Sequence, residues 1–193
     1  MSNWPLEIDR MPPFAYIKNF ITPQKCEEII NIGKKKGTQK GLVGFGAKSK
    51  YDKKIRKSSI VFLHHEDGLG PFFQELTSAV VSLNKQFYNF HISAFSEGLQ
   101  FTHYKAPGQK YGKHFDRGPN GIIRKLSVSI QLSDPTKYKG GDLNLYEGED
   151  PIKTLRDQGA LNAFPSFFIH EVTPVTKGER FSLVAWVTGD PFR

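Results

Sequence analysis

The segment Arg180-Phe-Ser-Leu-Val-Ala-Trp-Val187 alternates between two kinds of side chain, which predicts a β-strand. Apolar residues at 181, 183, 185 and 187 fall on one face, and the other face carries Arg180, Ser182, Val184 and Trp186. A face with an arginine, a serine and a tryptophan is the solvent side of a simple sandwich or the partly polar interior of a barrel-like fold. The alternation by itself leaves both arrangements open.

A second segment with the same period lies earlier in the chain. Apolar residues at 126, 128, 130 and 132 alternate with a lysine, serines and Gln131. This pattern is typical of a strand with one apolar and one polar face. The pair Gly140-Gly141 follows and predicts a turn or a bulge. From about Ile92 onward we therefore expect strands to dominate.

Two helices and one strand are predicted in the first half. Thr22 as N-cap, Pro23 at the first helical position and a following Gly37 predict a helix from Pro23 to about Lys36. A second helix is expected to begin near Pro71, with an apolar stripe formed by Phe72, Leu76, Val80, Leu83 and Phe87. Between the helices, residues 55–63 are predicted as a strand. The expected fold class is α+β and mostly β, with the N-terminal helices packed on one sheet.

Composition favours a single domain over residues 1–193, with helical support and a basic loop to about residue 90 and the strand-rich core after it. The formal charge of +8 is uneven, because residues 34–57 hold ten Lys or Arg and one acid, whereas the remainder holds 17 basic and 18 acidic residues. The single cysteine, Cys26, excludes an internal disulfide and is typical of a reducing compartment. Without a signal-peptide pattern or an apolar run of ~18 residues, a soluble cytoplasmic protein without membrane contact is expected.

Two histidines and an aspartate form a candidate metal site. His114 and Asp116 are two positions apart, so both side chains point to one face if the segment is extended. With His170 they would supply two imidazoles and one carboxylate, a set that suits non-haem Fe(II) with open coordination positions. Each also has an ordinary explanation, such as a chance His-x-Asp pair or, for Arg180, a solvated surface charge. His103 is the leading alternative ligand, because it lies near His114 in the sequence.

The chain resembles the Fe(II)- and 2-oxoglutarate-dependent oxygenases, specifically their prolyl 4-hydroxylase-like (PKHD-type) branch. The similarity lies in four stretches, which are Arg56-x-Ser58 with Phe62-Leu63, Tyr104-Lys-Ala-Pro-Gly-Gln-Lys-Tyr111-Gly-Lys-His114, Leu132-Ser-Asp-Pro135 with Gly140-Gly141-Asp-Leu143, and His170-Glu-Val-Thr-Pro-Val175 followed by Gly178-Glu-Arg180-Phe-Ser182. It covers roughly residues 55 to 190. It implies a double-stranded β-helix, or jelly-roll, core.

The resemblance also implies a role for each residue of the site. His114, Asp116 and His170 would hold Fe(II) and leave positions for 2-oxoglutarate and O2. Arg180 would bind the distal carboxylate of 2-oxoglutarate, and Ser182 on the same strand face would add a hydrogen bond. Further candidates for the cosubstrate pocket are Tyr104, Tyr111, Gln131 and Trp186, of which Gln131 stands where related hydroxylases carry a tyrosine. Whether ascorbate is needed as a reductant stays open.

The implied activity is hydroxylation of a prolyl residue in a protein or peptide, coupled to decarboxylation of 2-oxoglutarate to succinate. We interpret the segment from Gly41 to Lys57 as a basic lid that recruits an acidic or RNA-associated protein partner. Its candidate residues are Lys48, Lys50, Lys53, Lys54 and Arg56. The plain alternative is a solvated lysine-rich loop.

Other functions stay open. The same cofactor chemistry could act on a free amino acid, on another residue type or on nucleic acid, although related nucleic-acid dealkylases resemble a pattern with a second arginine where this chain has Trp186. A non-catalytic barrel that binds a polyanion would explain the basic charge, but it needs none of the metal ligands together. A structural zinc site is disfavoured, because such sites are usually rich in cysteine.

Overall fold

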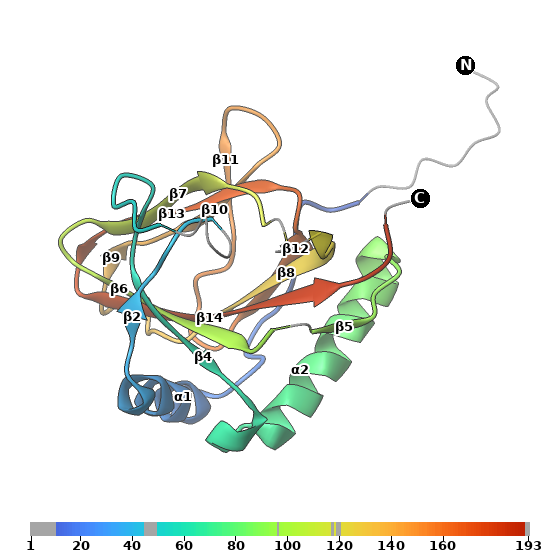
Figure 1. The fold of residues 1–193 in the computed structure, drawn as a ribbon, viewed down its shortest axis with the longest axis horizontal. Coiled ribbons are helices and arrows are strands. Elements are labelled where there is room, and N and C mark those ends of the chain that lie inside the picture. Colours follow the sequence, from blue (N-terminus) through green and yellow to red (C-terminus); the bar gives the residue numbers. More distant parts are fainter. Residues whose placement is uncertain (1–10, 45–49, 96, 117, 119–120, 192–193) are drawn as a thin grey trace.

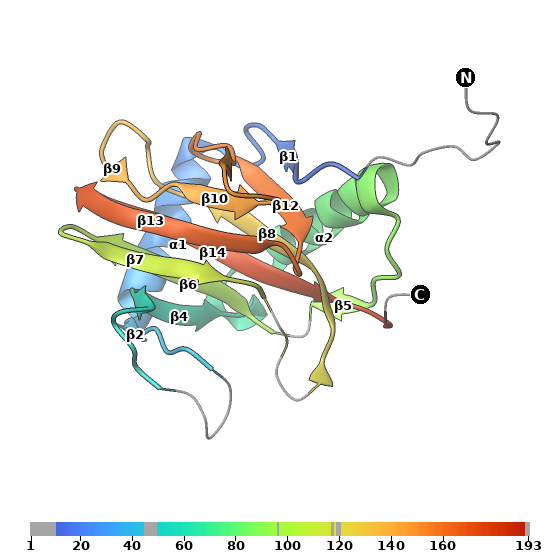
Figure 2. The same ribbon diagram turned by 90° about the horizontal axis from the view of Figure 1, so that it is seen from above.

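Two antiparallel β-sheets face each other in the computed structural model, which describes residues 11–44, 50–95, 97–116, 118 and 121–191 (Figures 1 and 2). The larger, eight-stranded sheet has the order β1 (Ala15–Ile17), β12 (Leu161–Pro165), β8 (Arg124–Gln131), β14 (Glu179–Thr188), β6 (Leu99–Lys105), β4 (Ser59–Leu63) and β2 (Gln39–Lys40), with β5 (Ala94–Phe95) also paired to β14. The smaller, six-stranded sheet has the order β11 (Pro151–Lys153), β10 (Leu143–Tyr146), β13 (Ile169–Lys177), β7 (Gln109–His114) and β3 (Arg56–Lys57), with β9 (Lys139–Gly140) paired to β13.

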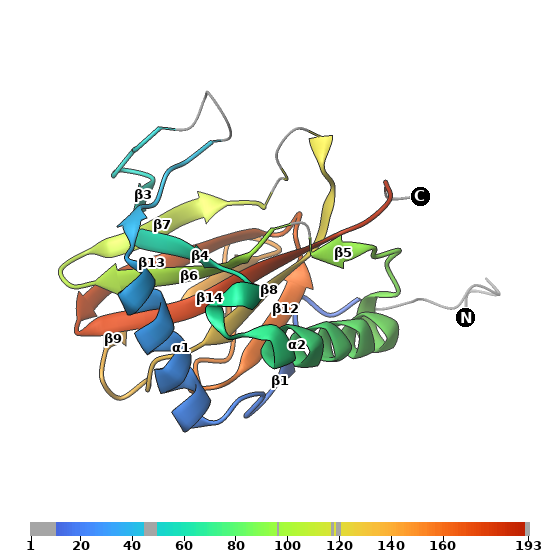
Figure 3. The same cartoon turned by 60° about the horizontal axis from the view of Figure 1, so that its bottom comes forward.

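Two helices, α1 (Pro23–Lys36) and α2 (Gly70–Leu83), cover the outer face of the larger sheet (Figure 3). The predicted bounds of α1 are confirmed. The Thr22 side chain accepts a hydrogen bond from the Lys25 amide at 3.2 Å, and Pro23 fills the first helical position. Gly37, with φ 84°, ends the helix in a conformation that favours glycine. A short 3-10 helix, η2 (His65–Asp67), precedes α2.

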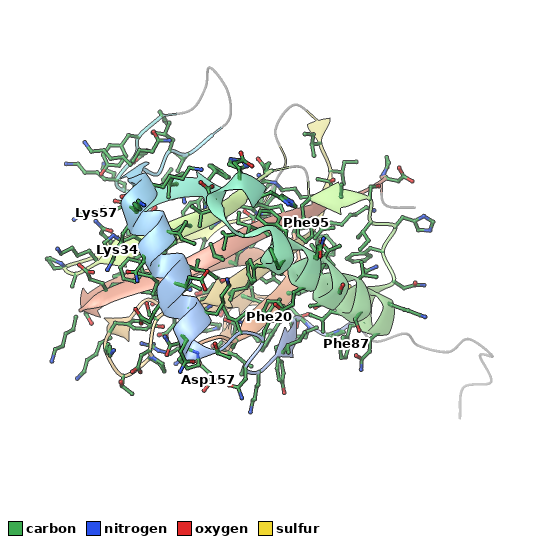
Figure 4. The ribbon with its side chains drawn as sticks, turned by 90° about the horizontal axis from the view of Figure 1, so that it is seen from below. Phe20, Lys34, Lys57, Phe87, Phe95 and Asp157 are labelled. Atoms are coloured by element: carbon green, nitrogen blue, oxygen red, sulfur yellow. The ribbon has the colours of Figure 1, made fainter. Side chains whose placement is uncertain are left out.

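The apolar stripe of α2 shifts by one residue at its C-terminal end. The side chains of Phe72, Leu76, Val80 and Leu83 are buried as predicted. Beyond them the chain continues as a π-helical turn, η3 (Asn84–Tyr88), and this wider turn holds one more residue than an α-helical turn. Tyr88 is therefore buried, and its hydroxyl donates to the Ala163 carbonyl at 2.9 Å. The prediction for Phe87 was wrong, because its side chain is 37% exposed at the end of the helix (Figure 4).

Strand β14 lies between β8 and β6 and has two different buried faces. Its apolar face, with Phe181 and Leu183, belongs to the main hydrophobic core under the two helices. Its other face, with Arg180, Ser182 and Trp186, turns into a cavity between the sheets. The structure therefore selects the partly polar interior over the solvent side. The serines of β8 are buried for the same reason, because both faces of that strand are covered.

The predicted strand over residues 55–63 is two strands in different sheets. β3 pairs with β7 of the smaller sheet, whereas β4 pairs with β6 of the larger sheet. The chain crosses between the sheets at Ser58, so one continuous segment contributes a strand to each sheet. The predicted turn or bulge is also confirmed. Gly140 and Gly141 have φ of 71° and 68°, and a Cβ on Gly140 would lie 2.0 Å from the Pro174 carbonyl oxygen.

Strands from the first 90 residues join both sheets. β1, β2 and β4 extend the larger sheet, and β3 edges the smaller one. The helical support thus shares its hydrogen-bonded framework with the strands after residue 90. Within the described residues, no helix is both long and apolar enough to cross a membrane. The division near residue 90 stays a prediction.

Candidate metal and cosubstrate site

One group of three metal-capable side chains is found in the described part of the chain, formed by His114, Asp116 and His170. Their candidate ligand atoms all lie within 4.8 Å of one another. β7 and β13 are antiparallel neighbours, and their register puts His170 opposite His114. Asp116 follows β7 after one further residue. Sheet pairing thus brings ligands from distant parts of the sequence to one point.

Both imidazoles are oriented by backbone carbonyls. His114 Nδ1 lies 2.7 Å from the Gly112 carbonyl oxygen, and His170 Nδ1 lies 2.9 Å from that of Phe168. A carbonyl only accepts hydrogen bonds, so each Nδ1 carries a proton, and in the neutral imidazole the lone pair is then on Nε2. His114 Nε2 lies 3.8 Å from Asp116 Oδ1, and His170 Nε2 lies 3.4 Å from Asp116 Oδ2. Fixed tautomers with converging Nε2 atoms are the arrangement that divalent transition metals bind.

Two buried serines hold the Asp116 carboxylate in place. Ser127 Oγ donates to Asp116 Oδ2 at 2.7 Å and lies 3.0 Å from Ser166 Oγ. The Asp116 amide also donates to the Ser166 carbonyl at 2.9 Å. Sequence reasoning did not assign a role to either serine. For Ser127, the sequence signal was its place on the polar face of the strand that contains Gln131, but a serine on such a face is usually interpreted as exposed to solvent.

The protonation states of His114 and Asp116 suit metal binding at neutral pH. Burial lowers the pKa of His114 to about 4, and the neighbouring His170 adds to this effect. Burial opposes ionisation of Asp116, but His170 and His114 together hold the pKa of this carboxyl below its usual range. Burial likewise opposes the charged form of His170, although Asp116 raises its pKa on balance. A neutral His114 beside an ionised Asp116 is the protonation state that a metal ligand needs.

Arg180 is a buried cation without a carboxylate partner among the described residues. Its side chain is 1% exposed. Its Nη2 donates to Gln131 Oε1 at 2.8 Å, its Nη1 donates to Ser182 Oγ at 3.3 Å, and its buried Nε has no hydrogen-bond partner within the described part of the chain. Burying an unneutralised guanidinium is costly, so the site is suited to an anionic ligand that completes the pair. A planar carboxylate matches this donor geometry.

A cavity of about 500 Å³ joins the metal-capable cluster to Arg180. Its wall contains all three cluster residues and, of the predicted cosubstrate residues, Arg180, Ser182, Tyr104, Tyr111 and Trp186. Gln131 is not in the wall, and it contacts the pocket through its hydrogen bond to Arg180. A dicarboxylate with a keto acid at one end could thus chelate a metal at the cluster and pair with Arg180 at its other end. The residues present fit Fe(II) and 2-oxoglutarate.

The aromatic side chains of the wall are held in defined positions. The Tyr111 ring stacks on His114 with centroids 3.5 Å apart, and the Arg56 guanidinium lies 4.5 Å from the centre of the same ring. Burial raises the pKa of both Tyr104 and Tyr111, so both keep their hydroxyl proton at neutral pH. The indole N–H of Trp186 is buried and has no hydrogen-bond partner in the ranges that the structure describes. These groups give the cavity hydrogen-bond donors on largely apolar walls.

The other predicted candidates lie in different places. His103 faces away from the cavity, where its ring stacks on Phe181 and its Nε2 lies 3.5 Å from Glu179. Among the basic candidates, Arg56 is buried in the cavity wall, whereas Lys50, Lys53 and Lys54 are exposed. Lys48 lies outside the described residues.

Part of the chain is similar in sequence to a known superfamily of enzymes. Residues 99–188 match the model of the 2OG-Fe(II) oxygenase superfamily. A PKHD-type hydroxylase of Sphingopyxis alaskensis is 35% identical over 109 residues, which cover 54% of this chain and 50% of that protein. One from Synechococcus elongatus is 32% identical over 124 residues, which cover 62% and 55%. The chain spans about half the length of the curated relatives it matches.

Solved structures show the same fold at low sequence identity. A prolyl hydroxylase from Trichoplax adhaerens, in complex with a peptide fragment of hypoxia inducible factor, aligns with a TM-score of 0.76 at 20% identity and covers 92% of this chain and 84% of its own. A prolyl-4-hydroxylase from Pseudomonas putida aligns with a TM-score of 0.68 at 19% identity, over 93% and 94%. The predicted jelly-roll fold and the predicted family resemblance are both confirmed.

Proposed function

We propose that this chain, whose resemblance to the 2OG-Fe(II) oxygenases is confirmed by the family model over residues 99–188, is a dioxygenase that hydroxylates a prolyl residue in a protein or peptide. The observation that carries the proposal is the single cavity that connects a His-Asp-His cluster to a buried arginine without a carboxylate partner among the described residues. A metal-binding end and an anion-binding end in one pocket are what a keto acid cosubstrate requires.

The residues of the chain have distinct tasks in this reaction. His114, Asp116 and His170 would bind Fe(II) through two Nε2 atoms and one carboxylate. Bound there, Fe(II) would supply the activation of O2 that couples hydroxylation of a C–H bond to conversion of 2-oxoglutarate into succinate and CO2. Arg180 would bind and orient the distal carboxylate, and the hydrogen bonds to Gln131 and Ser182 would fix the orientation of the guanidinium. The buried walls would exclude water from the reacting atoms.

A prolyl target is supported by two observations. Relatives that match in sequence are PKHD-type hydroxylases, and solved structures with the same fold include prolyl hydroxylases. The cavity wall near the metal-capable cluster also offers apolar and aromatic surface, from Tyr111, Phe115 and Trp186, against which a pyrrolidine ring can pack. Free amino acids and other residue types share the same chemistry, so the substrate needs a direct test.

The test is mass spectrometry of a proline-containing peptide library incubated with the protein, Fe(II), 2-oxoglutarate and O2, with and without ascorbate. We expect a gain of one oxygen on proline and a matching yield of succinate. The His114→Ala variant should form neither product. A gain of oxygen on another residue would keep the dioxygenase and reject the prolyl target, whereas succinate formation that is absent or unaffected by His114→Ala would reject the enzyme assignment.

A further inference from the structure

The end of the molecule beside the cavity carries a group of exposed or half-buried lysines with few acidic neighbours. We define the basic rim as five lysines on β2, on β3 and in the described part of the segment between them, which are Lys40, Lys50, Lys53, Lys54 and Lys57. None of them has an ion-pair partner among the described residues. Lys34, labelled with Lys57 in Figure 4, belongs to α1 on the outer face of the larger sheet, where its ammonium lies 4.7 Å from the centre of the Phe181 ring, and is not counted in the basic rim.

The sheet itself concentrates charge at the basic rim. In the antiparallel pair of β3 and β7, Lys57 stands directly opposite Lys110. Like charges at directly opposed positions destabilise a sheet, unless an anion lies between them. The neighbouring pair, Arg56 and Tyr111, faces the cavity. β3 thus presents one cation inside the cavity and the next one outside it.

The segment that carries the rim also forms part of the cavity wall. Lys40, Leu42, Val43, Ile55 and Arg56 line the same cavity as the metal-capable cluster. A polypeptide whose target side chain enters this cavity must therefore leave it past residues 40–44 and 50–57 or past the opposite wall. On the first route its flanking residues pass the unpaired ammonium groups of the basic rim.

The chemistry of the rim favours carboxylates over nucleic acid. Single-stranded nucleic-acid sites usually combine cations with aromatic platforms, and phosphate recognition favours the arginine fork. Among the described residues 34–44 and 50–57, the only aromatic is Tyr51, and the Lys40 ammonium already lies 5.1 Å from the centre of its ring. The exposed cations are all lysines, which attract carboxylates as point charges without a fixed geometry.

We propose that the basic rim binds acidic residues that flank the target residue of a peptide substrate. This inference rests on the proposed function, because it assumes that a peptide enters the cavity. The rim thereby selects substrates by charge, and it raises the rate of encounter with an acidic segment at low ionic strength.

The experiment compares three fluorescent peptides that share a central proline and differ only in flanks of glutamate, glutamine or lysine. Binding to the full chain, loaded with Mn(II) and 2-oxoglutarate, is followed by fluorescence anisotropy without turnover. We expect the glutamate peptide to bind about tenfold more tightly than the glutamine peptide, and the difference to shrink as salt is raised. The triple variant Lys50→Glu, Lys53→Glu, Lys54→Glu should reverse the order of affinities, and the corresponding glutamine variant should abolish it.

The matched control is the double variant Lys18→Glu, Lys85→Glu. Both lysines are exposed, and Lys18 follows β1 at the edge of the larger sheet opposite β2. The control should keep the wild-type preference.

Equal affinities for the three peptides, or a preference that survives the rim variants, would overturn the proposal. Tighter binding of a single-stranded RNA than of the glutamate peptide, lost in the same variants, would overturn it in favour of nucleic acid. Because binding is measured without turnover, absence of hydroxylation would count against the proposed function alone.

Discussion

Ser127 Oγ donates a hydrogen bond to Asp116 Oδ2 over 2.7 Å, and the Ser127 side chain is fully buried. This bond leaves Oδ1 of the carboxylate available for a metal and fixes the orientation of the group. Ser166 Oγ, 3.0 Å from Ser127 Oγ, supports the same hydroxyl. One carboxylate ligand is thus oriented by a neighbouring strand of the larger sheet, whereas both histidines belong to the smaller sheet.

We expect Ser127→Ala to weaken binding of Fe(II) or Mn(II) by about 10- to 100-fold, because an unanchored carboxylate binds metal less well. Calorimetric titration of the metal-free protein would measure this change without any turnover. Ser182→Ala is the matched control, since it removes a buried hydroxyl from the adjacent strand that bonds to Arg180 instead. Equal metal affinity in Ser127→Ala and the wild type would show that Asp116 needs no such anchor.

Replacement of Arg180 should separate cosubstrate binding from metal binding. We expect Arg180→Met to weaken 2-oxoglutarate by on the order of 100-fold, because the distal carboxylate loses its charged partner in a buried site. Affinity for Mn(II) alone should stay within a few-fold of the wild type. Arg180→Lys should restore part of the loss as a point charge without the fork. An unchanged affinity for 2-oxoglutarate, measured by titration of the Mn(II)-loaded variants, would contradict the assignment of the anion-binding end.

Cys26 should make stability depend on pH under alkaline conditions. Burial raises the pKa of this thiol from 9.0 to about 11, with a smaller contribution from Glu27. The folded protein therefore holds the proton in a range where the unfolded chain releases it, so the stabilisation is present below pH 9 and is lost as pH rises towards about 11. Urea unfolding across this range should show a shallower decline for Cys26→Ala than for the wild type. Parallel declines would assign the pH dependence to other groups.

At Gly33, helix α1 packs tightly against the larger sheet. A Cβ at this position would lie 2.6 Å from the Phe101 ring. We expect Gly33→Ala to destabilise the protein by about 1–3 kcal/mol through overpacking, in excess of the ~1 kcal/mol that alanine gains over glycine in a helix. Asn31→Ala, at an exposed position of the same helix, should be neutral or slightly stabilising. Chemical denaturation of the two variants measures the difference, and equal stability of the two would show that α1 shifts freely on the sheet.

The sequence predicted the bounds of the helices more accurately than the pairing of the strands. A capping threonine, an N1 proline and a terminal glycine act within a few residues, so the bounds of α1 followed from them directly. The predicted apolar stripe of α2 was wrong only at Phe87, because no local sequence pattern indicates the π-helical turn. The run over residues 55–63 has the pattern of one strand, and its division between two sheets depends on which distant strands pair with it.

The sequence by itself determined the chemical groups of the site, since His114, Asp116, His170 and Arg180 stand in a recognisable order and spacing along the chain. Only the tertiary structure decided their geometry. Pairing of β13 with β7 puts His170 opposite His114, and closure of the two sheets buries Arg180 without a carboxylate partner among the described residues. The tertiary structure also turned the polar face of β14 towards the cavity and placed His103 on the face of β6 that points away from the cavity. The reason is physical: side-chain types are local properties of the chain, whereas burial, register and the sharing of a cavity arise from contacts between residues far apart in sequence.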